Sequence, residues 1–235
     1  DALEELKRQA EEELMVQLQT ELKKIIETQE GVVSRGVKEL DDKRKARGAL
    51  ARDEVIRARE LGKAQDGLGK SLDEIKRRLK EENADVYHFV IDSATGDMSE
   101  AAAFLKAQPP DTGARTQDYQ NEAVRKLRDL LEAFDLKRKQ AKAGQSPPGG
   151  GGGGAGGRKA LVPDLVQLNM MRKLQEQLLS RTRDVHRGYK AEREDLSASE
   201  KVLLQRLSDE QGKLAMLMKR FVEKFDEMKK KAEQR

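Results

Sequence analysis

The sequence predicts an all-α, elongated protein: helical hairpins forming a coiled-coil-like bundle, in two segments joined by a Gly-rich linker. First, apolar residues recur at steps of three and four along most of the chain, which places them on one side of a helix. Second, 38% of the residues are charged and only 3% are aromatic, which favours narrow seams between helices over a thick core. Third, the linker at 144–160 contains the run GQSPPGGGGGGAGG, which is expected to be a flexible coil.

The segment 1–143 is predicted to contain about four helices. The first has an apolar stripe and is followed by Gly31 and Gly36, where we expect a bend or loop because glycine weakens a helix interior. The second is predicted from renewed stepping that surrounds Gly67 and Gly69. The stripes consist of Leu3, Leu6, Leu14, Leu18, Leu22 and Ile25 in the first helix, and of Leu61, Leu68, Leu72, Ile75 and Leu79 in the second.

The third predicted helix has a heptad seam and ends before Pro109, because the residue before a proline is driven out of the α region. A turn at 111–113 follows, and Thr116 is the predicted N-cap of the fourth helix. The seam residues are Tyr87, Ile91, Ala94, Met98, Ala101 and Leu105, followed by Leu127, Leu131 and Phe134 in the fourth helix.

The segment 161–235 is predicted to be a hairpin of two antiparallel helices joined near 188–197. Pro163 suits a first helical turn, and Ser197 with Glu200 has capping-box spacing. Gln211 is predicted to fill one polar core position. The predicted interaction seam consists of Leu165, Leu168, Leu174 and Leu178, and of Leu204, Leu207, Leu214, Met218, Phe221, Phe225 and Met228. Because two helices alone are marginal, this seam implies a protein partner or self-association.

Charge and composition narrow the function classes. Segment 1–143 carries 28 basic and 30 acidic residues, a net charge of −2, whereas 158–235 carries 19 and 13, a net charge of +6. The chain has no cysteine, so neither a disulfide framework nor a thiolate metal site is possible. No run approaches the ~18 consecutive apolar residues that span a bilayer. We therefore expect membrane association only through an upstream anchor, if any.

Two polar clusters have residue types found in functional sites but lack the pattern that such sites need. Asp85, His88 and Asp92 share one helix face, but a di-iron site needs a second such motif and further inward carboxylates. Ser180, Asp184 and His186 have the residue types of a catalytic triad, without a strained elbow or an oxyanion loop. The glycine tract lacks the Gly-Lys-Ser/Thr ending of a phosphate-binding loop. We predict no catalytic, cofactor-binding or metal-binding residue, no small-molecule substrate, and hence no enzyme.

The basic runs at 43–47 and 229–231 offer the alternative of nucleic-acid binding. Neither run is interleaved with aromatic residues, and both lie near acids such as Asp41, Asp42 and Glu227. A cytoplasmic, nucleic-acid-associated helical protein that uses its basic C-terminal half is therefore the alternative hypothesis.

Three groups of residues carry a resemblance to a known family. They are Met98, Ala102 and Leu105 with 111–113, Thr116, Gln117, Gln120 and 127–131; Pro163 and Leu168 with 172–175, Leu178 and Thr182; and the run 210–215. Over roughly 85–225 the chain resembles an uncharacterised family of exported, coiled-coil-rich bacterial envelope proteins that carry a signal peptide and a Pro/Gly-rich linker and have no known activity. The resemblance implies a leader cleaved before Asp1 and a periplasmic or cell-envelope location. Our leading expectation is a non-enzymatic structural or protein-interaction protein that acts by helix-seam packing.

Overall fold

A computed structural model describes the chain except residues 1, 81–84, 143–163, 191–197 and 234–235. All regular elements of the described residues are helical, so the all-α prediction is confirmed. The chain divides into two compact units, Asp1–Ser146 and Pro147–Arg235. The predicted linker at 144–160 lies outside the described residues.

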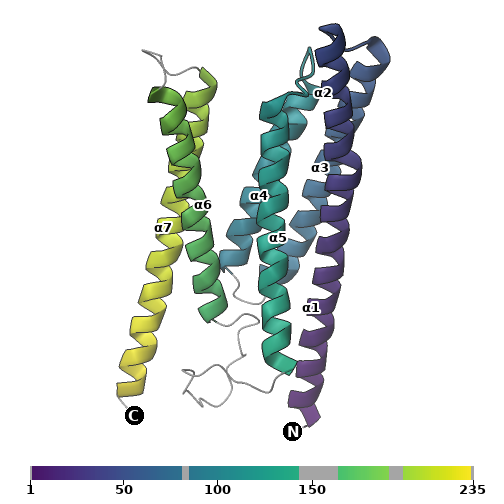
Figure 1. Cartoon of the computed structure of the whole chain (residues 1–235). Coiled ribbons are helices and arrows are strands. Elements are labelled where there is room, and N and C mark those ends of the chain that lie inside the picture. Colours follow the sequence, from purple (N-terminus) through teal and green to yellow (C-terminus); the bar gives the residue numbers. More distant parts are fainter. Residues whose placement is uncertain (1, 81–84, 143–163, 191–197, 234–235) are drawn as a thin grey trace. The chain divides into compact units, whose positions relative to one another are not determined.

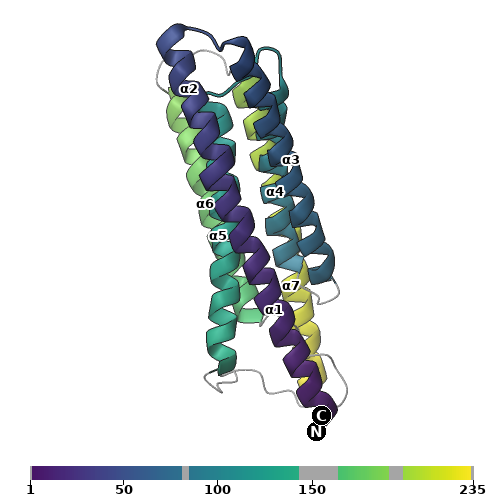
Figure 2. The same ribbon diagram turned by 90° about the vertical axis from the view of Figure 1, so that its right-hand side faces the viewer.

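The first unit has four helical segments, of which the first joins three consecutive elements end to end, and successive segments run in opposite directions (Figure 1). Its elements are α1 (Ala2–Thr28), the π-helix η1 (Gln29–Ser34), α2 (Arg35–Arg47), α3 (Arg52–Lys80), α4 (Asp85–Lys106) and α5 (Ala114–Lys142). Helix α4 packs mainly on α3 and α5, and α1 packs mainly on α5. Figure 2 shows α1 passing in front of α5.

The core of the first unit follows the predicted stripes closely. All six predicted seam residues of α4 are at most 1% exposed, and Leu72, Ile75 and Leu79 of α3 are fully buried. Tyr87 meets Phe134 of α5 edge-to-face, with ring centroids 5.1 Å apart. On α1 the stripe is buried at Leu18, Leu22 and Ile25 but exposed at Leu3 and Leu6. The periodicity of the sequence therefore predicted which residues form the centre of this unit.

The bend or loop expected at Gly31 and Gly36 is wrong, because the helix continues through both residues from α1 into α2. Gln29, Val33 and Val37 recur at steps of four through η1 into α2 and are all fully buried. A Cβ on Gly36 would lie 3.0 Å from Leu61 Cδ1, so this glycine permits close packing against α3. The chain turns only at Gly48, which ends α2 with φ +82° and donates its N–H to the Arg44 carbonyl at 2.8 Å.

Thr116 is not the N-cap of α5, because the helix begins at Ala114. The Thr116 hydroxyl donates backwards to the Asp111 carbonyl at 2.7 Å, while Asp111 Oδ1 accepts from the Gly113 N–H at 2.8 Å. The turn is thus an Asx turn, and the carboxylate closes it instead of the threonine. A comparable contact begins α3, where Glu54 Oε2 accepts from the Ala51 N–H at 2.9 Å.

The second unit consists of α6 (Asp164–Lys190) and α7 (Ala198–Glu233), which pack against each other (Figure 1). They run in opposite directions, as the sequence predicted. The connection at 191–197, including Ser197 of the predicted capping box, lies outside the described residues. Helix α7 has 36 residues and α6 has 27, so α7 extends beyond α6.

Candidate interaction surface

The two helices of the hairpin meet along one buried seam. On α6 the buried residues are Gln167, Met170, Met171, Leu174 and Leu178. On α7, Leu207, Glu210 and Leu214 are buried, and Leu203, Leu217 and Phe221 are partly buried. These positions recur at steps of three and four, as expected for one face of each helix.

The residues of the predicted seam have different environments. Leu174, Leu178, Leu207 and Leu214 are buried, and Leu204 and Phe221 are partly buried. Leu168, Met218 and Phe225 are 43%, 43% and 45% exposed. The side chains of Leu165 and Met228 lie outside the described part of the chain.

The polar core position predicted at Gln211 is wrong. Gln211 is exposed, and Glu210 is buried in its place, with its carboxylate 3.5 Å from Arg206 Nε one turn earlier. The observed seam keeps Leu207, Leu214 and Phe221 of the predicted one. Its other positions, Leu203, Glu210 and Leu217, each come one residue earlier than predicted, so the packed face of α7 is rotated by about 50°.

This rotation leaves a second apolar side of the hairpin uncovered. Leu168, Leu179, Met218 and Val222 each directly follow a buried or partly buried seam residue, and they are 43%, 46%, 43% and 56% exposed. Because α6 and α7 run in opposite directions, residues that directly follow the seam lie on the same side of the pair. With Arg172, which follows Met171, these four residues form a surface that we call the open face.

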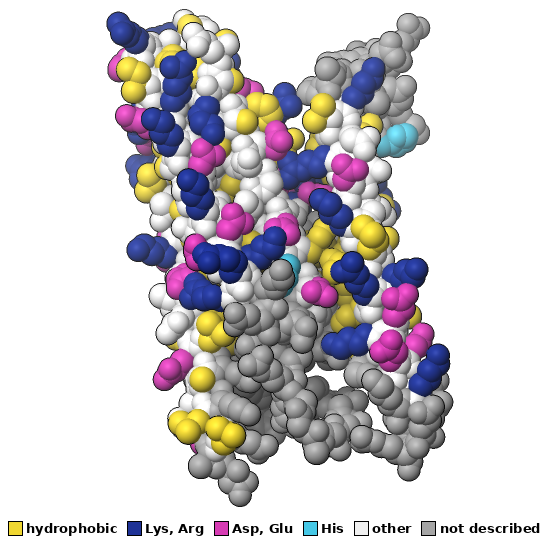
Figure 3. Space-filling view, turned by 180° about the vertical axis from the view of Figure 1, so that it is seen from behind, with side chains coloured by type: hydrophobic (Ala, Val, Ile, Leu, Met, Phe, Trp, Pro, Cys, Tyr) yellow, Lys and Arg dark blue, Asp and Glu magenta, His cyan; other side chains and the backbone are white. Residues whose placement is uncertain are grey.

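Polar residues and charges of both signs border the open face. The other described residues that directly follow the seam are Gln175, Leu204, Ser208, Gln211 and Ala215. Arg183 and Lys219 lie at its edges, and so do Glu176, three residues before Leu179, and Asp226, four residues after Val222. In Figure 3 hydrophobic, basic and acidic side chains are interspersed on the visible face of the hairpin. The open face is therefore a set of exposed apolar residues with polar residues between them and charges of both signs at its edges.

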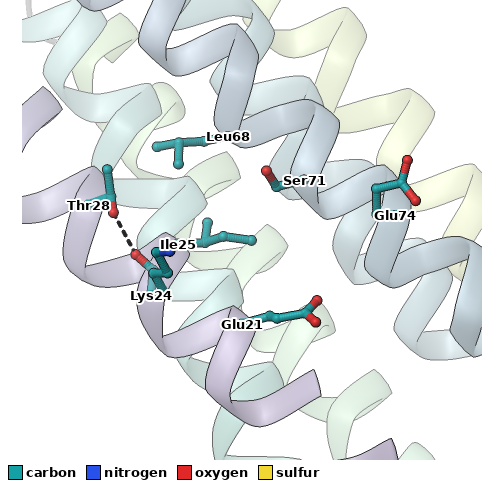
Figure 4. A pocket seen from close by; sticks show the side chains of 7 residues that line it. All are labelled: Glu21, Lys24, Ile25, Thr28, Leu68, Ser71 and Glu74. Atoms are coloured by element: carbon teal, nitrogen blue, oxygen red, sulfur yellow. Dashed lines mark hydrogen bonds between the residues drawn. The ribbon is translucent and has the colours of Figure 1, made fainter. Parts of the chain in front are cut away.

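The first unit has a groove between α1 and α3, with a cavity volume of about 320 Å³ (Figure 4). Ile25 and Leu68 form its apolar floor, and Glu21 and Glu74 lie along its edges. The hydroxyls of Thr28 and Ser71 also line it, but each donates to a carbonyl of its own helix, at 2.8 and 3.2 Å. The glutamates pair with Arg78 and Arg77. The hydroxyls and carboxylates that line this groove are thus paired within the unit, and Lys24 is its remaining polar side chain.

The core of the first unit holds two polar clusters that the sequence analysis missed. Gln29, Gln65 and Gln120 are all fully buried and bonded to one another, with Gln29 Nε2 and Gln120 Nε2 donating to Gln65 Oε1 at 3.1 and 3.0 Å. Lys126 of α5 pairs with Asp97 of α4 at 2.7 Å, where the two side chains are 4% and 0% exposed. Both clusters join neighbouring helices and are sealed from solvent, which suits a packing role.

The rejected cluster of Asp85, His88 and Asp92 does not converge on a metal position. Asp85 and Asp92 are exposed, and Asp92 pairs with Lys76. Burial lowers the pKa of His88, although a hydrogen bond with the Leu79 backbone opposes this shift. Across the described residues no group of three or more His, Asp or Glu side chains is placed to hold a metal ion.

The rejected triad residues on α6 are all solvated. Ser180, Asp184 and His186 are exposed, and Asp184 lies 3.8 Å from Arg187 on the same helix. They form no cleft, so the geometry gives none of them the environment that activates a nucleophile.

The basic run at 43–47 is paired within the first unit. Arg44 and Lys45 contact the buried carboxylate of Asp41, each at 2.7 Å, and Lys43 and Arg47 contact Glu54. The Arg47 contact, with the Ala51 N–H, lowers the pKa of Glu54 to about 2. Four basic side chains of this run are therefore engaged by acids of the same unit.

Comparisons with models of protein families, with curated proteins and with solved structures find no match to this chain. Among the helices of the described residues, none has an apolar stretch long enough for a membrane span.

Proposed function

We propose that the chain is a non-enzymatic protein-interaction or structural protein that acts by helix-seam packing through the open face of its hairpin. The observation that carries the proposal is the exposure of Leu168, Leu179, Met218 and Val222 on one side of α6 and α7. Each is about half exposed, and burying what remains is worth about 1 kcal/mol per side chain. Together they offer about 4 kcal/mol to a partner, a substantial fraction of a micromolar affinity.

A bacterial cell-envelope location is part of the proposal, and the family resemblance over roughly 85–225 supports it. Fractionation of cells that produce the chain natively tests this part by itself. Recovery in the periplasmic or envelope fraction is expected, whereas recovery with cytoplasmic proteins would contradict the location and leave the interaction role standing.

In-cell photocrosslinking tests the interaction role. A photoreactive amino acid at Val222 is expected to give adducts with a discrete protein, because this position lies on the open face. The matched control places the same amino acid at Glu223, which is also exposed but lies about 100° further round α7. Adducts from position 222 alone support the proposal, and equal adducts or none from both positions contradict it.

Nucleic-acid binding has less support than helix-seam packing. Four side chains of the run 43–47 already contact Asp41 or Glu54, and the centre of the open face is apolar. This alternative predicts duplex binding that weakens steeply as salt rises.

A further inference from the structure

We draw no further inference here: the strongest candidate, the apolar groove between α1 and α3 over Ile25 and Leu68, has its carboxylates and hydroxyls paired within the first unit, and nothing in the structure shows what covers it.

Discussion

The buried ion pair between Asp97 and Lys126 gives the sharpest test of how the first unit is held together. Lys126→Met keeps the length of the side chain but removes the cation that lies 2.7 Å from Asp97 Oδ2. The Asp97 side chain is fully buried, so no bulk water replaces the lost cation. We expect the variant to lose about 3–5 kcal/mol of unfolding free energy, the usual result of leaving a charge buried without its partner.

The matched double variant Asp97→Val with Lys126→Met removes both charges at once. An ion pair that is replaced by apolar residues of similar volume is often neutral or stabilising, because the desolvation of both ions is no longer required. We therefore expect the double variant to be within about 1 kcal/mol of the wild-type chain. The loss in the single variant should then come from the stranded carboxylate and not from the missing attraction.

Urea unfolding followed by helical circular dichroism measures both free energies on the full chain, and hydrogen exchange assigns the loss to α4 and α5. A loss of about 4 kcal/mol corresponds to a fall in melting temperature of about 10 °C for a unit of this size. The reasoning would be refuted if the single variant lost less than about 1 kcal/mol, or if the double variant lost as much as the single one.

Three further predictions concern other parts of the first unit. Gly62→Ala should lower the free energy of unfolding by about 1–3 kcal/mol, because the new Cβ would lie 3.1 Å from the Ala102 carbonyl oxygen. The Cβ of Gly67→Ala would enter open space, so this control should raise the free energy of unfolding by up to about 1 kcal/mol. Thermal unfolding compares the two variants. The pKa of Glu54 is lowered to about 2, so its carboxylate contributes to folding stability above pH about 4.3, and this contribution is lost as the pH falls towards 2. Glu54→Gln should therefore reduce the loss of stability over this pH range. Unfolding measured as a function of acid pH tests this. Burial lowers the pKa of His88, so its neutral form contributes stability that is full above pH about 6.5 and falls below it; His88→Gln should remove that dependence in urea titrations at pH 5 to 7.

The sequence predicted the core of α4 well because the helix is buried on several sides. Tyr87, Ile91, Met98 and Leu105 step at the heptad spacing and are all buried, so any rotation of α4 would expose one of them. Periodicity is sufficient where the apolar stripe is wide and has no competitor.

Polar core positions were missed for a physical reason. Gln65 and Asp97 look like surface residues in a single sequence, because glutamine and aspartate are usually exposed. Their burial is stabilised by hydrogen bonds to partners on other helices, Gln29 and Lys126. These partners lie 36 and 29 residues away in the sequence. The prediction of a bend at Gly36 was wrong for a related reason. This glycine permits close contact with Leu61 of another helix, and the sequence does not show that contact.

The rotation of α7 could not be predicted because the helix has two apolar stripes. Leu203, Leu207, Leu214, Leu217 and Phe221 form one stripe, which turns towards α6. The predicted stripe shares Leu207, Leu214 and Phe221 with it but continues through Leu204, Met218 and Phe225. The two differ by about one residue, so periodicity alone does not choose between them.

The same ambiguity supports the proposed interaction role. A helix that packs on one neighbour needs only one narrow stripe, whereas a helix that packs on two needs a wider apolar face. Covering one stripe of α7 with α6 leaves Met218 and Val222 exposed at 43% and 56%, beside Leu168 and Leu179 of α6. The property that made the rotation hard to predict is thus the one on which the proposed interaction surface rests.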